Sequence, residues 1–451
     1  MLTPKPTYPD LASRSAALYE RARRRIPAGG SRALTFVKPY PVYAAKAEGC
    51  VITDVDGVER LDFIANYTVQ IHGHGHPAIV AAIKEQVERA VCMTLPTELE
   101  IELAEMLCAR ATGFERIRFT NSGTEAVMVA MKAARAFTGR PKIAKCEGVY
   151  HGGYDYAEVS LDSDPQNWGG EQPVSVGYTR GVPAGVLADM VVLPFNDVAG
   201  SLKVLEANAA GLAGILLDPV PSRCGGLPAT PEYLAALQSF ARSNGSLFMF
   251  DEVVSFRLDY GGAQSRLGVV PDMTTLGKII GGGLPIGAVA GKAEVMAVFD
   301  QSAGKAAYPH SGTFNANPLT MAAGIAAMRL LSRESLDRLN ALGDRARVVL
   351  RQAFTDAGVA GQVTGEGSLF LLHFGTDALG DYRRAYRAHS ERDQERLAQL
   401  YRNLLNHGVI ISSWGLGCLS TPMGEIEIAR LGQATLAALR DLKAQEAHTE
   451  V

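Results

Sequence analysis

The chain has 451 residues, which is enough for a large core and for two or more domains. Its net charge of -3 gives no electrostatic reason to bind nucleic acid or an anionic membrane surface. No apolar run approaches the roughly 20 residues of a membrane-spanning helix, and residues 1–25 lack the apolar core of a signal peptide. The 6 cysteines are scattered without a CxxC pair, which favours a reduced compartment. We therefore expect a cytoplasmic enzyme that acts on small molecules, with no nucleic-acid or membrane partner.

The N-terminal region predicts short helices and strands joined by loops. In chain order these are a helix at 11–26, strands at 43–52 and 60–63 around a turn at 54–57, a helix at 77–91, and a helix at 97–110 with a capping box of Thr97 and Glu100. The loop before residue 77 contains His72, His74 and His76, which suggest a metal cluster. No carboxylate or cysteine stands at a ligand spacing, so we interpret this segment as a loop that leads into a helix and expect no metal site.

A strand at 117–120 is followed by a tight turn and a helix that extends to Phe137. The turn contains Ser122, Gly123 and Thr124. Free N–H groups and the positive end of a helix dipole at a strand tip suit a phosphate, and two hydroxyls would add to the site. The alternative is that Ser122 or Thr124 only caps the helix. The turn is not a Walker loop, because no Gly-Lys-Ser/Thr follows.

A strand at 142–145 leads to Tyr150 and His151. An aromatic side chain after a strand end either stacks on a flat cofactor ring or only packs, and the residues alone leave both open. Residues 155–188 show little periodicity, which predicts a long functional or mobile loop. The elements that follow alternate and so predict a mostly parallel α/β sheet: strands at 190–193 and at 213–217, which ends at Asp218, and helices at 198–209 and 231–244.

The apolar run 247–250 predicts a buried parallel strand that ends at Asp251 and Glu252. Ligands of open α/β sheets bind beyond the carboxyl ends of the strands. Lys278 lies in an apolar, Gly-rich segment, where desolvation lowers the pKa of an amine and makes it nucleophilic. Pyridoxal phosphate (PLP) needs such a pair, because a lysine forms its Schiff base and an acid keeps its ring nitrogen protonated. The alternative is that Asp251 caps a helix and that Lys278 lies at a helix end.

Beyond Lys278 the sequence predicts a strand at 287–290, a polar turn at 310–318 and a helix that extends to Leu331. From Ser335 on, the pattern changes to charged helices at 335–357, 392–407 and 424–443 that alternate with short strands at Val363, 369–374 and 409–412. This change predicts a second, smaller α+β domain. We expect an N-terminal segment at 1–60 that contributes to the small domain and the active-site entrance, a large cofactor-binding domain at 61–320, and the small domain at 321–451.

Five motifs together resemble the class III (fold type I) PLP-dependent aminotransferases. They are FTNSGTEA at 119–126, YHGG at 150–153, FDEV at 250–253, TTLGKIIGGG at 274–283 and HSGTFNANP at 310–318. The subgroup that the chain resembles most contains glutamate-1-semialdehyde aminomutase and the β-amino-acid aminotransferases of the β-phenylalanine type. The resemblance implies an α/β fold with a large, mostly parallel sheet domain and a smaller α+β domain, PLP as the cofactor, and an amino acid and a keto acid as substrates.

The resemblance also implies roles for the matching residues. Lys278 would hold PLP and move the proton between substrate and cofactor, and Asp251 would pair with the ring nitrogen. The other implied cofactor-binding residues are Ser122, Gly123 and Thr124 at the phosphate, Tyr150 and Val253 on the two ring faces, His151 of the YHGG motif, and Thr313 at the phosphate of the partner subunit's cofactor. The role of Thr313 implies a homodimer with shared active sites.

The choice of substrate depends on a few residues. Arg32 resembles an arginine that binds the substrate carboxylate, for which a planar cation is suited, and the alternative is a surface arginine. Arg257 is a second cation near Asp251 with an equally good structural interpretation. HSGTFNANP and the RL-x-x-GG pattern after residue 256 are more similar to the β-amino-acid enzymes than to the aminomutases, which read GT-[FL]-S-G-NP. We therefore expect amino transfer from a β-amino acid to a keto acid, with glutamate-1-semialdehyde 2,1-aminomutase activity as the alternative.

Two positions depart from the family pattern. Asp218 stands where family members frequently have Glu. The segment 412–417 lacks an arginine that the β-phenylalanine enzymes carry nearby, so Trp414 either lines the substrate pocket or simply packs.

Overall fold

The computed structural model describes residues 7–302, 304–388 and 391–449. The chain divides into two compact units. The sheet unit comprises Pro77–Asp337 and Ala378–Tyr386, and the terminal unit comprises Met1–His76, Arg338–Asp377 and Arg387–Val451. The chain passes from one unit to the other after residues 76, 337, 377 and 386.

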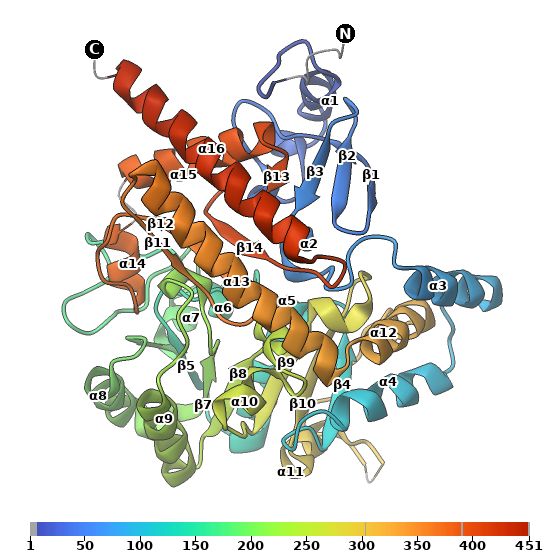
Figure 1. Ribbon diagram of the computed structural model, residues 1–451. Coiled ribbons are helices and arrows are strands. Elements are labelled where there is room, and N and C mark those ends of the chain that lie inside the picture. The colour runs from blue at the N-terminus through green and yellow to red at the C-terminus, as the bar shows by residue number, and fades with distance from the viewer. Residues whose placement is uncertain (1–6, 303, 389–390, 450–451) are drawn as a thin grey trace. The chain divides into compact units, whose positions relative to one another are not determined.

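The sheet unit is built on a sheet with strand order β4-β10-β9-β8-β7-β5-β6 (Figure 1). β10 is antiparallel to β4 and β9, and all other neighbours are parallel, which confirms the mostly parallel α/β sheet. The strands are β4 (Arg116–Thr120), β5 (Lys142–Cys146), β6 (Met190–Leu193), β7 (Leu212–Leu217), β8 (Leu247–Asp251), β9 (Met273–Gly277) and β10 (Gly287–Gly291).

The central strands are apolar at nearly every position because helices cover both sheet faces. Phe248 and Phe250 of β8 lie in one core with Tyr233 of α9 (Pro231–Asn244), while Met249 lies in another core with Ala130 of α5 (Gly123–Thr138). On the α9 face, α8 (Val198–Asn208) lies beside α9 (Figure 1). The remaining helices of this unit are α3 (Pro77–Arg89), α4 (Glu98–Cys108), α6 (Asp155–Glu158), α7 (Ala184–Asp189), α10 (Gly262–Leu267), α11 (Ala293–Met296), α12 (Pro318–Leu330) and most of α14 (Tyr382–Ala388).

The terminal unit contains two small sheets. One has the order β1-β2-β3-β13, with β13 parallel to β3, and the other has the antiparallel order β11-β12-β14. Helices α15 (Glu391–Asn406) and α16 (Glu425–Thr449) pack against each other (Figure 1). The other elements are α1 (Arg14–Ala22), β1 (Ala44–Glu48), β2 (Val51–Asp54), β3 (Glu59–Asp62), α2 (Ala65–Thr68), β11 (Gly361–Thr364), β12 (Leu369–Phe374), β13 (Val409–Ile410), β14 (Leu416–Cys418) and α13 (Arg333–Ala357), which begins in the sheet unit.

Three local predictions were wrong. The strand expected at 43–52 is two strands, because Gly49 adopts a left-handed φ of 55° and ends β1 one residue earlier. The capping box at Thr97 does not form: its hydroxyl oxygen is buried and bonds to no residue that the structure describes. The loop expected at 155–188 contains α6 and most of α7. Strand β9, which the sequence did not predict, lies between β8 and β10.

The strand register brings several chain segments to one edge of the sheet. Leu217 of β7 pairs with Phe250 of β8, so the next residues, Asp218 and Asp251, are neighbours at the carboxyl ends. Asp251 itself pairs with Thr275 of β9. Gly277, the last residue of β9, and Thr120, the last residue of β4, both pair with Gly287. The acid of β8, the residue after β9 and the N-terminus of α5 therefore lie at the same edge.

Candidate active site

Asp251 ends strand β8 and is almost fully buried, with 6% of its surface exposed. Its Oδ1 accepts hydrogen bonds from the Val253 amide at 3.1 Å and the Thr275 hydroxyl at 3.0 Å, and its Oδ2 lies 2.7 Å from Nδ1 of His151. Burial alone raises the pKa of this carboxyl, but the bonds from His151, Val253 and Thr275 outweigh burial and hold the pKa below its usual range. A carboxylate has about four acceptor positions. Asp251 is therefore an anion with one acceptor position left for a cationic ligand atom.

His151 lies behind Asp251 and is 2% exposed. Burial lowers the pKa of its imidazole, and the nearby Asp251 carboxylate opposes this shift. Because an ionised carboxylate only accepts hydrogen bonds, Nδ1 of His151 carries the proton of the shared bond. Its Nε2 is buried and bonds to no residue in the described part of the chain. His151 thus acts through Asp251.

Lys278 follows β9 and begins the short 3-10 turn η6 (Lys278–Gly281). Its φ of 49° lies in the left-handed region, which costs a residue with a side chain about 1–3 kcal/mol and is characteristic of functional sites. Burial lowers the pKa of the Lys278 amine, while Asp251 and Asp218 oppose this shift. The lowered pKa increases the fraction of neutral, nucleophilic amine.

The turn before α5 has the features of an anion-binding site. The Ser122 hydroxyl oxygen accepts a hydrogen bond from the Glu125 amide at 3.1 Å and caps the helix, as one of the two sequence interpretations expected. The amides of Gly123 and Thr124 stand at the positive end of this 16-residue helix. A Cβ atom on Gly123 would come within 2.9 Å of a methyl carbon of Val253, so only glycine permits this approach. The start of the helix and the Ser122 hydroxyl therefore suit an anion.

The other predicted residues lie in different surroundings. Tyr150 is 56% exposed in the loop after β5, where burial of its ring and the nearby Glu158 and Asp251 raise the pKa of its hydroxyl. Thr313 is exposed in the turn before α12. Arg257 is completely buried, which favours its structural interpretation.

Arg32 and Trp414 belong to the terminal unit. Arg32 is exposed, and its guanidinium donates a hydrogen bond to Oδ1 of Asn66 at 2.5 Å. Trp414 stacks on the ring of Tyr67, with centroids 5.6 Å apart and planes 16° apart. Asn66 and Tyr67 belong to a run with positive φ at residues 65–68, which directs the two side chains toward these partners.

The sheet-edge residues fit PLP in three respects. The amide groups at the start of α5 suit a phosphate, the Asp251 carboxylate suits a protonated ring nitrogen, and the Lys278 amine suits an aldehyde carbon. The close approach of Gly123 to Val253 places this turn against a side chain two residues after Asp251. The cofactor predicted from the motifs is thus matched by the chemistry of the groups around it.

A family model for the class III aminotransferases matches residues 35–431. The chain belongs to the class III aminotransferases. An omega-transaminase from Sphaerobacter thermophilus has a closely similar structure, with a TM-score of 0.94 and 49% identity over 97% of this chain and 99% of that one. A second solved relative, a transaminase with PLP bound, is 46% identical over 96% of this chain and 98% of that one, with a TM-score of 0.88. PLP is the cofactor of this aminotransferase.

Two curated relatives carry different activities. The glutamate-1-semialdehyde 2,1-aminomutase of Methanosarcina acetivorans is 38% identical over 88% of this chain and 91% of its own length. The β-phenylalanine transaminase of Variovorax paradoxus is 37% identical over 94% of this chain and 92% of its own length. The two activities are the two that the motifs left open.

One polar residue and one hydrogen bond of this aminotransferase site were not predicted from the sequence, whereas His151 itself was expected to bind the cofactor. Thr275 was missed because β9 was not predicted, although Met273–Leu276 is a short run with two β-branched residues that could have indicated a strand. The bond between His151 and Asp251 joins residues 100 positions apart, and no local pattern indicates it.

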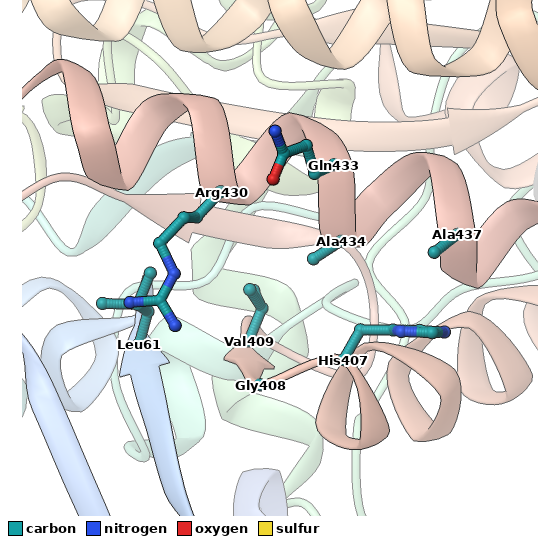
Figure 2. A pocket seen from close by; sticks show the side chains of 8 residues that line it. All are labelled: Leu61, His407, Gly408, Val409, Arg430, Gln433, Ala434 and Ala437. Atoms are coloured by element: carbon teal, nitrogen blue, oxygen red, sulfur yellow. The ribbon is translucent and has the colours of Figure 1, made fainter.

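A pocket of about 220 Å³ lies within the terminal unit, and Figure 2 shows the side chains that line it. Arg430, Ala434 and Ala437 of α16 line it together with Leu61 and the residues around His407. None of the residues predicted to bind the cofactor lines this pocket. Within the described residues no group of three or more His, Cys, Asp or Glu side chains is arranged to hold a metal ion, and no helix is both long and apolar enough to cross a bilayer.

Proposed function

We propose that this aminotransferase moves an amino group from a β-amino acid to a keto acid. The observation that carries the proposal is the turn at residues 313–318. Asn315 accepts a hydrogen bond from Asn121, next to the phosphate-binding turn, at 2.8 Å, where the aminomutase pattern has a shorter serine. The 49% identity to an omega-transaminase supports amino transfer.

The roles of the residues follow from their surroundings. PLP, when bound, supplies a carbonyl that condenses with amines and a ring that withdraws electrons. Lys278, with its lowered pKa, removes and returns the proton at the carbon that bears the amino group. The Asp251 anion keeps the ring nitrogen protonated, and the start of α5 holds the phosphate. Arg32 is the proposed partner of the substrate carboxylate, and its bond to Asn66 fixes the direction of its guanidinium.

We also propose that the enzyme is a homodimer with shared active sites. Large apolar side chains between residues 87 and 101 are exposed in the single chain, among them Leu95 at 76% and Ile101 at 59%. A group of this kind favours a protein interface. Thr313 is exposed and free to reach the cofactor phosphate of the partner subunit. The 6 cysteines, none of which forms a disulfide among the described residues, agree with the cytoplasmic location expected from the sequence.

The substrate test uses the absorption of the Lys278-bound cofactor. Purified enzyme is mixed with (S)- or (R)-β-phenylalanine, with β-aminobutyrate, or with glutamate-1-semialdehyde, each with and without a keto acid. Loss of the absorption with a β-amino acid, and its recovery on addition of a keto acid, is the expected result. Conversion of the semialdehyde to 5-aminolevulinate without a keto acid would establish the aminomutase instead. Lys278→Ala is the control that removes the reacting amine.

A further inference from the structure

Asp218 is a second carboxyl at the edge of the sheet that holds Asp251 and Lys278. It follows β7 directly, as Asp251 ends β8, and the register places the two side by side. Adjacent strands lie about 4.8 Å apart, so two ionised carboxylates here would repel each other strongly. Lys278 comes three residues after Thr275, the β9 partner of Asp251. The edge therefore carries two acids and one amine in a small volume.

The two carboxyls differ in the hydrogen bonds they accept. Asp251 accepts three, from His151, Val253 and Thr275. Asp218 accepts one, from the Val220 amide to Oδ1 at 2.9 Å, and the structure records no donor for its Oδ2 among the described residues. When two neighbouring acids share a site, the negative charge settles on the one with more donors, and the other keeps its proton.

The surrounding groups support this division. Burial, and then the charge of Asp251, raise the pKa of Asp218 to about 8, although the Val220 amide and Lys278 oppose the shift. Asp251 is shifted in the opposite direction, below its usual pKa. The titratable groups that act on Asp218 come from several elements and are Asp251, Glu252, Lys278, Cys146 and Cys224. Lys278 is the one amine in this group, and the others are carboxyls and thiols.

We propose that Asp218 carries a proton at neutral pH and is a positioning residue. Of the two neighbouring carboxyls only Asp251 is then ionised, and the amine of Lys278, when it is not bonded to the cofactor, stays unprotonated. An ionised Asp218 would stabilise the ammonium form of Lys278 and reduce its reactivity. A protonated Asp218 leaves Asp251 as the only ionised carboxyl of this pair, and three hydrogen-bond donors already stabilise its charge. The proposal deepens the proposed function, on which it rests for Lys278 being the reacting amine.

The first test observes the proton directly. Full-length enzyme with ¹³C-labelled aspartate is studied by infrared spectroscopy from pH 6 to pH 10. Labelling aspartate alone separates Asp218 from Glu252, whose pKa burial raises to about 7. We expect a band of a protonated aspartate at pH 7 that fades as the pH rises through about 8 and that is missing in Asp218→Asn. The lack of this band in the wild-type enzyme at pH 7 would overturn the proposal, whether or not the variant folds.

The second test measures Lys278 in full-length enzyme from which PLP has been removed. Reductive methylation of Lys278 is followed by peptide mass spectrometry in wild type, in Asp218→Asn and in Asp197→Asn, which changes an exposed helix cap. Wild type and Asp218→Asn should react equally below pH 7, where both are neutral at residue 218. Above pH 8 the wild type should fall behind by up to about tenfold, the one-unit shift that a nearby opposite charge causes. A tenfold difference at pH 7 as well would show that Asp218 is ionised there.

Both tests are independent of cofactor and substrate. An enzyme that failed to transfer amino groups but showed the aspartate band and the methylation difference would contradict the proposed function and leave the proton on Asp218. An enzyme that transferred amino groups but lacked the aspartate band and the methylation difference would contradict only the role of Asp218. Asp197→Asn should match the wild type throughout, and a change in this control of the size expected for Asp218→Asn would overturn the assignment to residue 218.

Discussion

Replacement of His151 tests whether Asp251 depends on its buried hydrogen-bond partner. His151→Leu removes the donor at a similar side-chain volume, and His151→Asn keeps an N–H group near the position of Nδ1. The native bond is 2.7 Å long between two side chains that are 2% and 6% exposed. A buried hydrogen bond to a charged group contributes about 1.5–3 kcal/mol, which corresponds to about one to two pKa units.

The expected result for His151→Leu is a rise of about one to two units in the pKa of Asp251. Asp251 has a lowered pKa in the folded enzyme, so its contribution to stability and to cofactor binding is present above its unfolded pKa and is lost as the pH falls through the folded pKa. In His151→Leu this loss begins at a higher pH. The cofactor should therefore dissociate on acidification at a pH about one to two units above that of the wild type, whereas its Kd at pH 7, where Asp251 is ionised in both proteins, should change little.

Titration of the PLP-free enzyme with PLP, followed by absorption at several pH values, measures both effects. His151→Asn should lie close to the wild type. If His151→Leu loses PLP on acidification at the same pH as the wild type, the bond does not support Asp251 and the reasoning fails. Equal losses in both variants would point to the shape of the imidazole and not to its N–H group.

Three further predictions concern the cofactor site and its surroundings. Mixed dimers of Lys278→Ala and Thr313→Ala protomers should recover activity that neither variant shows alone, because one of the two shared sites is then intact; sites built from one subunit would show no such recovery. Gly123→Ala should weaken PLP binding by about tenfold in a direct titration, since its Cβ would come within 2.9 Å of Val253, whereas an unchanged Kd would mean that the turn can shift. Lys145 is fully buried, and burial lowers its pKa to about 7, so the unfolded state binds more protons than the folded state between pH 7 and about 10. The free energy of unfolding of the wild type, measured in urea relative to that of Lys145→Met, should therefore rise over this pH range.

The centre of the fold could be predicted because its signals are local. The apolar runs of β7 and β8 and the acids that follow them are adjacent in the sequence, and the predicted strands match within one residue. Strand β9 was missed because Met273–Gly277 is short and ends in glycine, so that its burial comes from its neighbours β8 and β10 and not from its own pattern. The capping box at Thr97 failed for a related reason, since capping depends on the direction of one hydroxyl that the sequence does not determine.

In the candidate site, too, some features can be read from local sequence and others depend on contacts between distant segments. Asp218 and Asp251 follow apolar runs of the same kind, so the sequence presents them as equivalent acids. They differ only in what lies around them: Thr275 comes from a strand that the sequence did not predict, and His151 comes from a loop 100 residues away. These donors place the charge on Asp251, and the repulsion between the neighbouring carboxyls then leaves the proton on Asp218. The residue types of an active site are thus set by the motifs, whereas their protonation states are set by the strand register and the contacts between distant segments.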